Sequence, residues 1–143
     1  MRITFIPLFI FTCLLFSCQE SFTETEVSLE SYKVEDGFEL EVVAAEPLLK
    51  APVAIDFDSN GRVWVAQMPG YMSDMQGSEE DDPTGSILIL EDLDADGVAD
   101  HSKVFMDSIV MPRALSHVYG GLLYAIPPNL WFVEIENDLP VNR

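Results

Sequence analysis

The stretch Val53–Ala66, VAIDFDSNGRVWVA, holds two runs rich in β-branched and aromatic residues that are separated by Asn60-Gly61. An Asn-Gly pair between two such runs predicts a β-hairpin, because both residues accept the positive φ angles that a tight turn requires. Upstream, Phe38–Ala44 alternates apolar and acidic residues, and downstream Ile87–Leu90 is a short apolar run bounded by turn residues. Both are typical of strands. The sequence therefore predicts an all-β chain.

The hairpin recurs later in the chain. Arg113–Ala125 aligns with Val53–Ala66, and both segments follow a proline and carry glycine where the chain should turn. Ile87–Glu91 then aligns with Leu130–Glu134, so that Leu88 corresponds to Trp131. Two copies of a hairpin plus a third strand predict antiparallel blades of a β-propeller. A β-sandwich whose two halves are similar by coincidence is the alternative.

The length limits how much of a propeller is present. A blade takes four strands and a propeller roughly 4–8 blades, so residues 34–143 suffice for about one and a half blades. The segment after Asp138 reads as a tail without a closing strand. We expect the N-terminal part of a longer propeller, and the alternative is a ring assembled from several chains. Five aromatic residues are expected between blades: Trp64, Tyr119, Tyr124, Trp131 and Phe132.

The first residues differ from the rest. Ile3–Phe16 is almost entirely apolar but shorter than the roughly 20 residues of a membrane span, which is typical of a secretory signal. Its end, Leu15-Phe16-Ser17-Cys18, resembles the lipobox of bacterial lipoproteins, where the cysteine is lipidated after cleavage. We expect a lipoprotein signal peptide over residues 1–17 and an acidic tether over residues 18–33. An ordinary signal peptide with a chance cysteine is the alternative.

The charge of the chain limits its partners. Against 25 Asp+Glu stand 7 Lys+Arg, which gives a formal net charge of −18. Such an excess repels nucleic acids and favours cations or neutral substrates. The expected partners are therefore a membrane, reached through the lipid on Cys18 in the cell envelope, and a neutral small molecule. The sequence holds no CxxCH haem motif.

One short acidic segment has the spacing of a metal site. In EDLDADGVAD, Glu91–Asp100, aspartates alternate, a glycine follows, and another aspartate comes three residues later. This matches the first nine positions of a calcium loop, in which position 7 contributes a backbone carbonyl. Lys103 stands where an EF-hand has glutamate, so the motif predicts a calcium loop between strands; a solvated acidic loop is the alternative. The expected ligands are Asp92, Asp94, Asp96, the carbonyl of Val98, and Asp100.

Two residues are candidates for catalysis. His117 falls on the first strand of the second repeat, where it can face a central channel and act as a base, although a packed, hydrogen-bonded histidine is the commoner case. Arg113 is one of few cations and can clamp an anionic group, or simply pair with one of the many acids.

The chain resembles a known family in four segments: Phe38–Pro47, Pro52–Val65, Ile89–Asp100 and Pro127–Phe132. They are similar to the start of the membrane-bound dehydrogenase family, large secreted or lipoprotein β-propellers of planctomycetes, Verrucomicrobia and Bacteroidetes. That family is similar in turn to soluble quinoprotein glucose and sorbosone dehydrogenases.

The resemblance implies a dehydrogenase that acts on a sugar or polyol with pyrroloquinoline quinone. It offers only His117 and Arg113 as counterparts of cofactor contacts, so we expect this fragment alone to be inactive. A non-catalytic surface propeller that binds glycans or partner proteins is the alternative.

Overall fold

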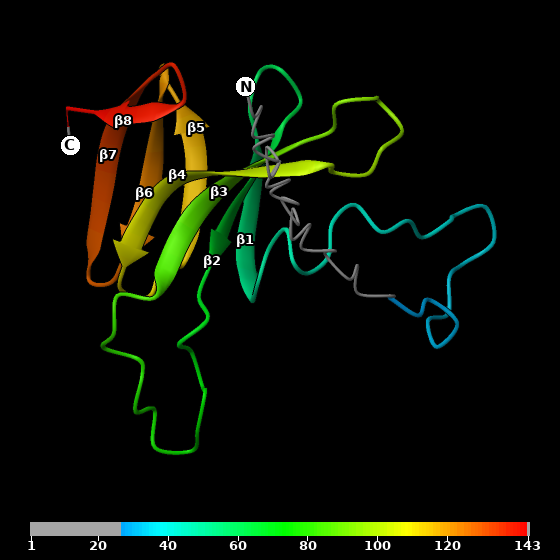
Figure 1. Cartoon of the computed structure of the whole chain (residues 1–143), viewed down its shortest axis with the longest axis horizontal. Coiled ribbons are helices and arrows are strands. Elements are labelled where there is room, and N and C mark those ends of the chain that lie inside the picture. Colours follow the sequence, from blue (N-terminus) through cyan, green and yellow to red (C-terminus); the bar gives the residue numbers. More distant parts are fainter. Residues whose placement is uncertain (1–26, 143) are drawn as a thin grey trace, which may run out of the picture.

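The computed structural model describes residues 27–142, and this part of the chain is built from β-strands without any helix (Figure 1). Eight strands form two four-stranded antiparallel sheets, each with its strands in chain order. The first sheet contains β1 (Pro52–Phe57), β2 (Val63–Gln67), β3 (Gly85–Glu91) and β4 (His101–Ile109). The second contains β5 (Ala114–Val118), β6 (Gly121–Ile126), β7 (Asn129–Glu136) and β8 (Leu139–Val141). The expected all-β class is confirmed.

The β1–β2 hairpin forms where the Asn-Gly signal predicts it, with Phe57 paired to Val63. Its turn differs from the expected one. The N–H of Gly61 donates to the carbonyl of Asp58 at 3.0 Å, and the N–H of Asp58 donates to the carbonyl of Arg62 at 3.1 Å. Positive φ falls on Gly61 alone, at +82°. A three-residue loop with one left-handed glycine therefore replaces the two-residue turn.

The equivalent turn of the second sheet has two residues, Tyr119 and Gly120, with φ angles of 50° and 78°. Positive φ at both central positions is the pattern of a type I′ turn, whose twist matches that of the flanking strands. Gly121 lies inside β6, and a Cβ there would overlap the carbonyl oxygen of Val133. Glycine is needed at 121 for space and at 120 for the backbone angle.

The second sheet has a fourth strand, contrary to the expectation that the chain runs out after the third. Asn137 and Asp138 turn the chain with φ angles of 51° and 57°, which both residue types tolerate well. Leu139 then pairs with Glu136, and Pro140 pairs with Ile135. Pro140 cannot donate to a ladder, but β8 is an edge strand, where proline is accepted.

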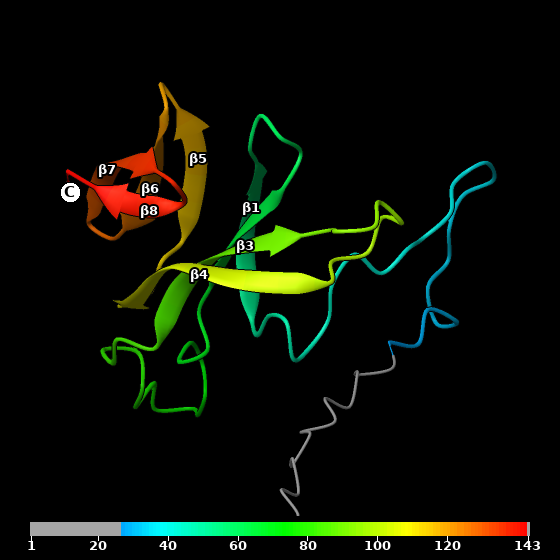
Figure 2. The same cartoon turned by 45° about the horizontal axis from the view of Figure 1, so that its top comes forward.

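The main core lies between the two sheets, which stand side by side with β5 next to β1 (Figure 2). Trp64 and Tyr124 are both buried there, as expected for aromatic residues between sheets. The ring of Trp64 meets that of Phe105 edge to face at 4.7 Å between centroids. Tyr119 is fully exposed, so the expectation that it packs between sheets is wrong.

Residues 38–44 form no strand, although their alternation predicted one. The N–H of Ala99 donates to the carbonyl of Val43 at 2.7 Å, and no ladder pairs this segment with a strand of the described chain. Ala44 and Leu48 instead pack against Val65 and its neighbours on the outer face of the first sheet. Packing of a few apolar side chains therefore positions this segment without backbone pairing.

Candidate functional site

The aspartate loop joins β3 to β4. The N–H of Asp100 closes it by donating to the carbonyl of Glu91 at 2.9 Å. Inside the loop, the carboxylate of Asp92 accepts the N–H of Ala95 at 2.7 Å and that of Gly97 at 2.9 Å. The N–H of Gly97, above all, lowers the pKa of Asp92 from its ordinary value. The carboxylate thus stays ionised in a fixed position.

Three of the four predicted carboxylates come together. One oxygen from each of Asp92, Asp94 and Asp100 lies within 4.8 Å of the other two, and all three residues are exposed. Asp96 is outside this group, and its carboxylate accepts the N–H of Val98 at 2.8 Å. A set of oxygen donors of this kind fits a hard divalent cation such as calcium.

A pocket of about 1020 Å³ lies beside the aspartate loop. Its walls come from the segment around Ala44 and Leu48 and from the end of the loop at Val98. Asp96 and Asp100 also line it, so the pocket combines an apolar wall with carboxylates. The segment that failed to form a strand thereby becomes one side of this pocket.

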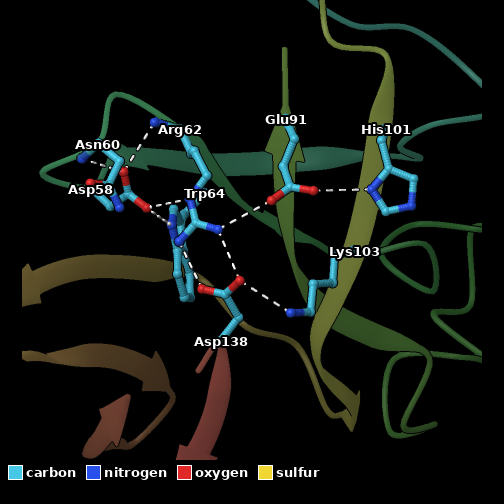
Figure 3. A network of polar contacts seen from close by, with 8 residues as sticks. All are labelled: Asp58, Asn60, Arg62, Trp64, Glu91, His101, Lys103 and Asp138. Atoms are coloured by element: carbon cyan, nitrogen blue, oxygen red, sulfur yellow. Dashed lines mark hydrogen bonds and ion pairs between the residues drawn. The ribbon is translucent and has the colours of Figure 1, made fainter. Parts of the chain in front are cut away.

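Arg62 lies at the centre of a charge network that sequence analysis did not identify (Figure 3). Its Nε donates to Asp58 at 2.8 Å and its Nη1 to Glu91 at 3.2 Å. Its two terminal nitrogens donate to the two oxygens of Asp138 at 2.9 and 2.7 Å. Lys103 donates to Asp138 as well, at 3.1 Å. The network connects the β1–β2 turn and the strands β3 and β4 of the first sheet with the β7–β8 turn of the second.

The network shifts the acidities of its members. The hydrogen bond from Arg62, with help from Lys103, holds the pKa of Asp138 far below its ordinary value. Asp138 in turn raises the pKa of Arg62. The scarcity of cations in this acidic chain was the available signal that Arg62 would be paired. The identity of its partner was hidden, because Asp138 is 76 residues away.

His117 is packed between the sheets and does not face an open channel. Its backbone N–H donates to Oδ2 of Asp56 at 2.6 Å, and its ring Nδ1 lies 3.3 Å from the same oxygen. The ring meets Trp64 edge to face, with centroids 4.5 Å apart. Its Nε2 is buried without a hydrogen-bond partner among the described residues. The backbone hydrogen bond from His117 lowers the pKa of Asp56.

Arg113 lies just before β5 and is exposed. Its guanidinium carbon is 5.5 Å from the centroid of the Tyr71 ring, a cation–π contact with the long loop between β2 and β3. His117 lies near the other end of β5, about 13 Å away at the rise of an extended strand. The structure does not bring these two candidate catalytic residues together.

A smaller pocket of about 420 Å³ lies where three hairpin turns approach one another. The turns contain Asn60, Tyr119 and Asn137, and the inner wall includes Trp64 and His117. Sequence analysis gave no binding role to these turns. The exposed, left-handed Tyr119 could not be recognised from sequence, because its conformation depends on the length of the turn.

The predicted signal peptide, the expected lipidation site Cys18 and most of the predicted tether lie outside the described residues. Within residues 27–142, no helix is long and apolar enough to cross a membrane.

A family model described as a domain of unknown function, DUF7133, matches residues 24–139. The chain therefore belongs to the DUF7133 family. No curated protein matches it, and no solved structure does.

Proposed function

We propose that this member of the DUF7133 family supplies two consecutive blades of a β-propeller, in an envelope protein anchored by a lipid on Cys18. In its complete form the protein acts as a quinoprotein-like dehydrogenase on a sugar or polyol. The proposal depends on the propeller architecture. We infer that architecture from one observation, which is the position of the exposed apolar residues of the second sheet.

Four residues of the first sheet bury their side chains against the second sheet: Trp64, Ala66, Ile87 and Ile89. The sequence repeat aligns four residues of the second sheet with them: Leu123, Ala125, Leu130 and Phe132. By strand alternation these side chains are on the face turned away from the first sheet, opposite the buried Leu122, Tyr124 and Val133. There Leu130 is 68% exposed and Phe132 is 40% exposed.

The second sheet therefore repeats, without a neighbour, the face by which the first sheet packs. The outer face of the first sheet is apolar as well, with Ile55 59%, Phe57 58% and Val104 54% exposed. Apolar surface of this extent is uncommon on a monomer and indicates a packing partner. A stack that is apolar on both sides is what two neighbouring blades of a propeller require.

Calcium at the aspartate loop is part of the proposal. Asp92, Asp94 and Asp100 would hold the ion, and the carboxylate of Asp96 and the carbonyl of Val98 are the further expected donors. When bound, the ion neutralises carboxylates that otherwise repel one another. Its role is structural, because the loop only links β3 to β4 and no candidate base lies within the triad.

The redox centre is proposed on the family resemblance. The described residues do not by themselves fit a quinone, because His117 and Arg113 are at opposite ends of β5 and Nε2 of His117 is buried. We therefore assign no catalytic step to them. The dehydrogenase reaction requires residues from further blades.

A non-catalytic surface propeller that binds glycans is the second candidate. The separation of His117 from Arg113 favours it, and so do the unpaired side-chain amides near Tyr119, which can hold a neutral ligand without redox chemistry.

The native protein, purified from the membranes of its source cells, distinguishes the two functions. Dye reduction would be assayed with pyrroloquinoline quinone and calcium across a panel of sugars and polyols. Quinone-dependent turnover is the expected result. Saturable glycan binding without any turnover would favour the surface propeller and reject the dehydrogenase.

A further inference from the structure

Three hairpin turns converge at one end of the two sheets and enclose the pocket of about 420 Å³. They are the turns at Asp58–Arg62, Tyr119-Gly120 and Asn137-Asp138. The three turns come from both sheets, so this pocket exists only because the sheets pack together. It is also separate from the aspartate loop and its larger neighbouring pocket, with which it shares no lining residue.

Tyr119 is the most unusual residue of this pocket. Its φ of 50° is left-handed, a conformation that bulky side chains rarely adopt and that asparagine or glycine occupies at this turn position at lower cost. Its side chain is fully exposed, so no packing against other side chains offsets the strained backbone. Strained residues of this kind gather at ligand sites.

The pocket that Tyr119 lines also contains polar side-chain groups without partners. Within residues 27–142, the side-chain amides of Asn60 and Asn137 and the hydroxyl of Ser59 make no hydrogen bond to protein. Each amide offers a donor and an acceptor in one plane, which suits two neighbouring hydroxyl groups. The turns thus present an aromatic face beside several free hydrogen-bonding groups.

The charged residues that line the pocket disfavour binding of an anion. Arg62 lines it, but its guanidinium is already occupied by Asp58 and Asp138, which line the pocket too. The wall therefore carries no free cation, and the net charge of −18 repels anionic ligands at longer range. A neutral ligand rich in hydroxyl groups meets all of these conditions.

We infer that this three-turn pocket binds a neutral polyhydroxylated ligand, a pyranose sugar or a polyol. The Tyr119 ring packs against the C–H face of the ligand, and Asn60 and Asn137 hydrogen-bond its neighbouring hydroxyls. The inference rests on the proposed function only for the substrate class. It needs neither the quinone nor a catalytic step.

The test uses the full chain, labelled with ¹⁵N and held in a mild detergent, and titrates D-glucose and sorbitol while amide shifts are recorded. Saturable shifts confined to the three turns are expected, and tert-butanol at the same concentration should not produce them. Tyr119→Asn keeps a residue that tolerates positive φ, so the fold is retained while the ring is removed. This variant should lose most of the saturable shift.

Tyr32→Asn is the matched control, because Tyr32 is also exposed but lies in the N-terminal segment away from the pocket. It should titrate like the wild type. Absence of saturable shifts, or equal shifts in Tyr119→Asn, would overturn the inference. If the pocket fails this test but the native protein shows quinone-dependent turnover, the proposed function is retained and only the pocket assignment is rejected. Sugar binding to the three turns without turnover would support the assignment of the pocket and reject the dehydrogenase function.

Discussion

The guanidinium of Arg62 and the carboxylate of Asp138 form a bidentate ion pair with nitrogen–oxygen distances of 2.7 and 2.9 Å. Arg62 lies in the β1–β2 turn, directly before β2, and Asp138 lies in the last turn of the other sheet. Parallel bonds of this kind fix orientation as well as distance. The pair therefore holds the β7–β8 turn against the β1–β2 turn at the end where the three-turn pocket forms.

Asp138→Asn should destabilise the chain by about 2 kcal/mol at neutral pH, because it removes a charged acceptor from Arg62 and Lys103. The pKa of Asp138 is lower in the folded chain than its ordinary value of 3.8, so its contribution is complete above that pH. The contribution is lost as the pH falls through the lowered pKa. Urea unfolding of wild type and variant at a series of pH values measures this.

Asp36→Asn is the control, since it removes the same charge from an exposed residue outside the sheets. An equal loss of stability in both variants would mean that net charge, and not the ion pair, is responsible.

Leu122→Ala and Leu130→Ala form a matched pair for the propeller proposal. Leu122 is buried between the sheets, so its truncation should cost about 2–5 kcal/mol in this chain. Leu130 is 68% exposed, and its truncation should cost about 0.5 kcal/mol or less. If a further blade covers Leu130 in the native protein, as we propose, the two costs should become similar there. Thermal melts of both variants in both settings test this, and a Leu130→Ala that stays neutral in the native protein contradicts a following blade.

Removal of calcium should lower the melting temperature. At a free concentration of about 100 times the dissociation constant, a bound ion adds roughly 2.7 kcal/mol of stability. Asp94→Ala should abolish the difference between melts with and without chelator. Asp96→Ala should reduce it less, because Asp96 is outside the group formed by Asp92, Asp94 and Asp100. A wild-type melt that does not respond to chelator would reject the site.

Tyr119→Asn should stabilise the chain by about 1 kcal/mol, because asparagine adopts a left-handed backbone at lower cost than tyrosine. Gly121→Ala, two residues later, should strongly destabilise it, since the added Cβ would overlap the carbonyl of Val133. The denaturant midpoints of the two variants, compared with that of the wild type, show whether each substitution raises or lowers the stability. A destabilised Tyr119→Asn would show that the tyrosine side chain supports the turn.

On the proposal that Cys18 carries the lipid, Cys18→Ser should abolish incorporation of radiolabelled palmitate and release the protein from the membrane fraction. Cys13→Ser is the matched control, as Cys13 lies inside the apolar run of the proposed signal peptide. Unchanged labelling of Cys18→Ser would reject the lipoprotein proposal.

Local chemistry was enough to predict much of the fold. Asn60-Gly61 indicated the first hairpin, and the repeat indicated the second, because turns and strand alternation depend on neighbours in the sequence. The same reasoning failed for Phe38–Ala44, whose alternation met no strand to pair with, and for β8, which was too short to recognise. The proximity of Asp92, Asp94 and Asp100 could be predicted from their spacing, because all three belong to one short loop.

By itself, the sequence determined the two hairpins and the acidic loop, since these depend on residues close together in the chain. Only the tertiary structure decided that Asp56 would meet His117 across 61 residues, and that Arg62 would meet Asp138 across 76. Both contacts depend on how one sheet rests on the other. That arrangement is set by the packing of Trp64 and Tyr124 in a shared core, which no local pattern encodes.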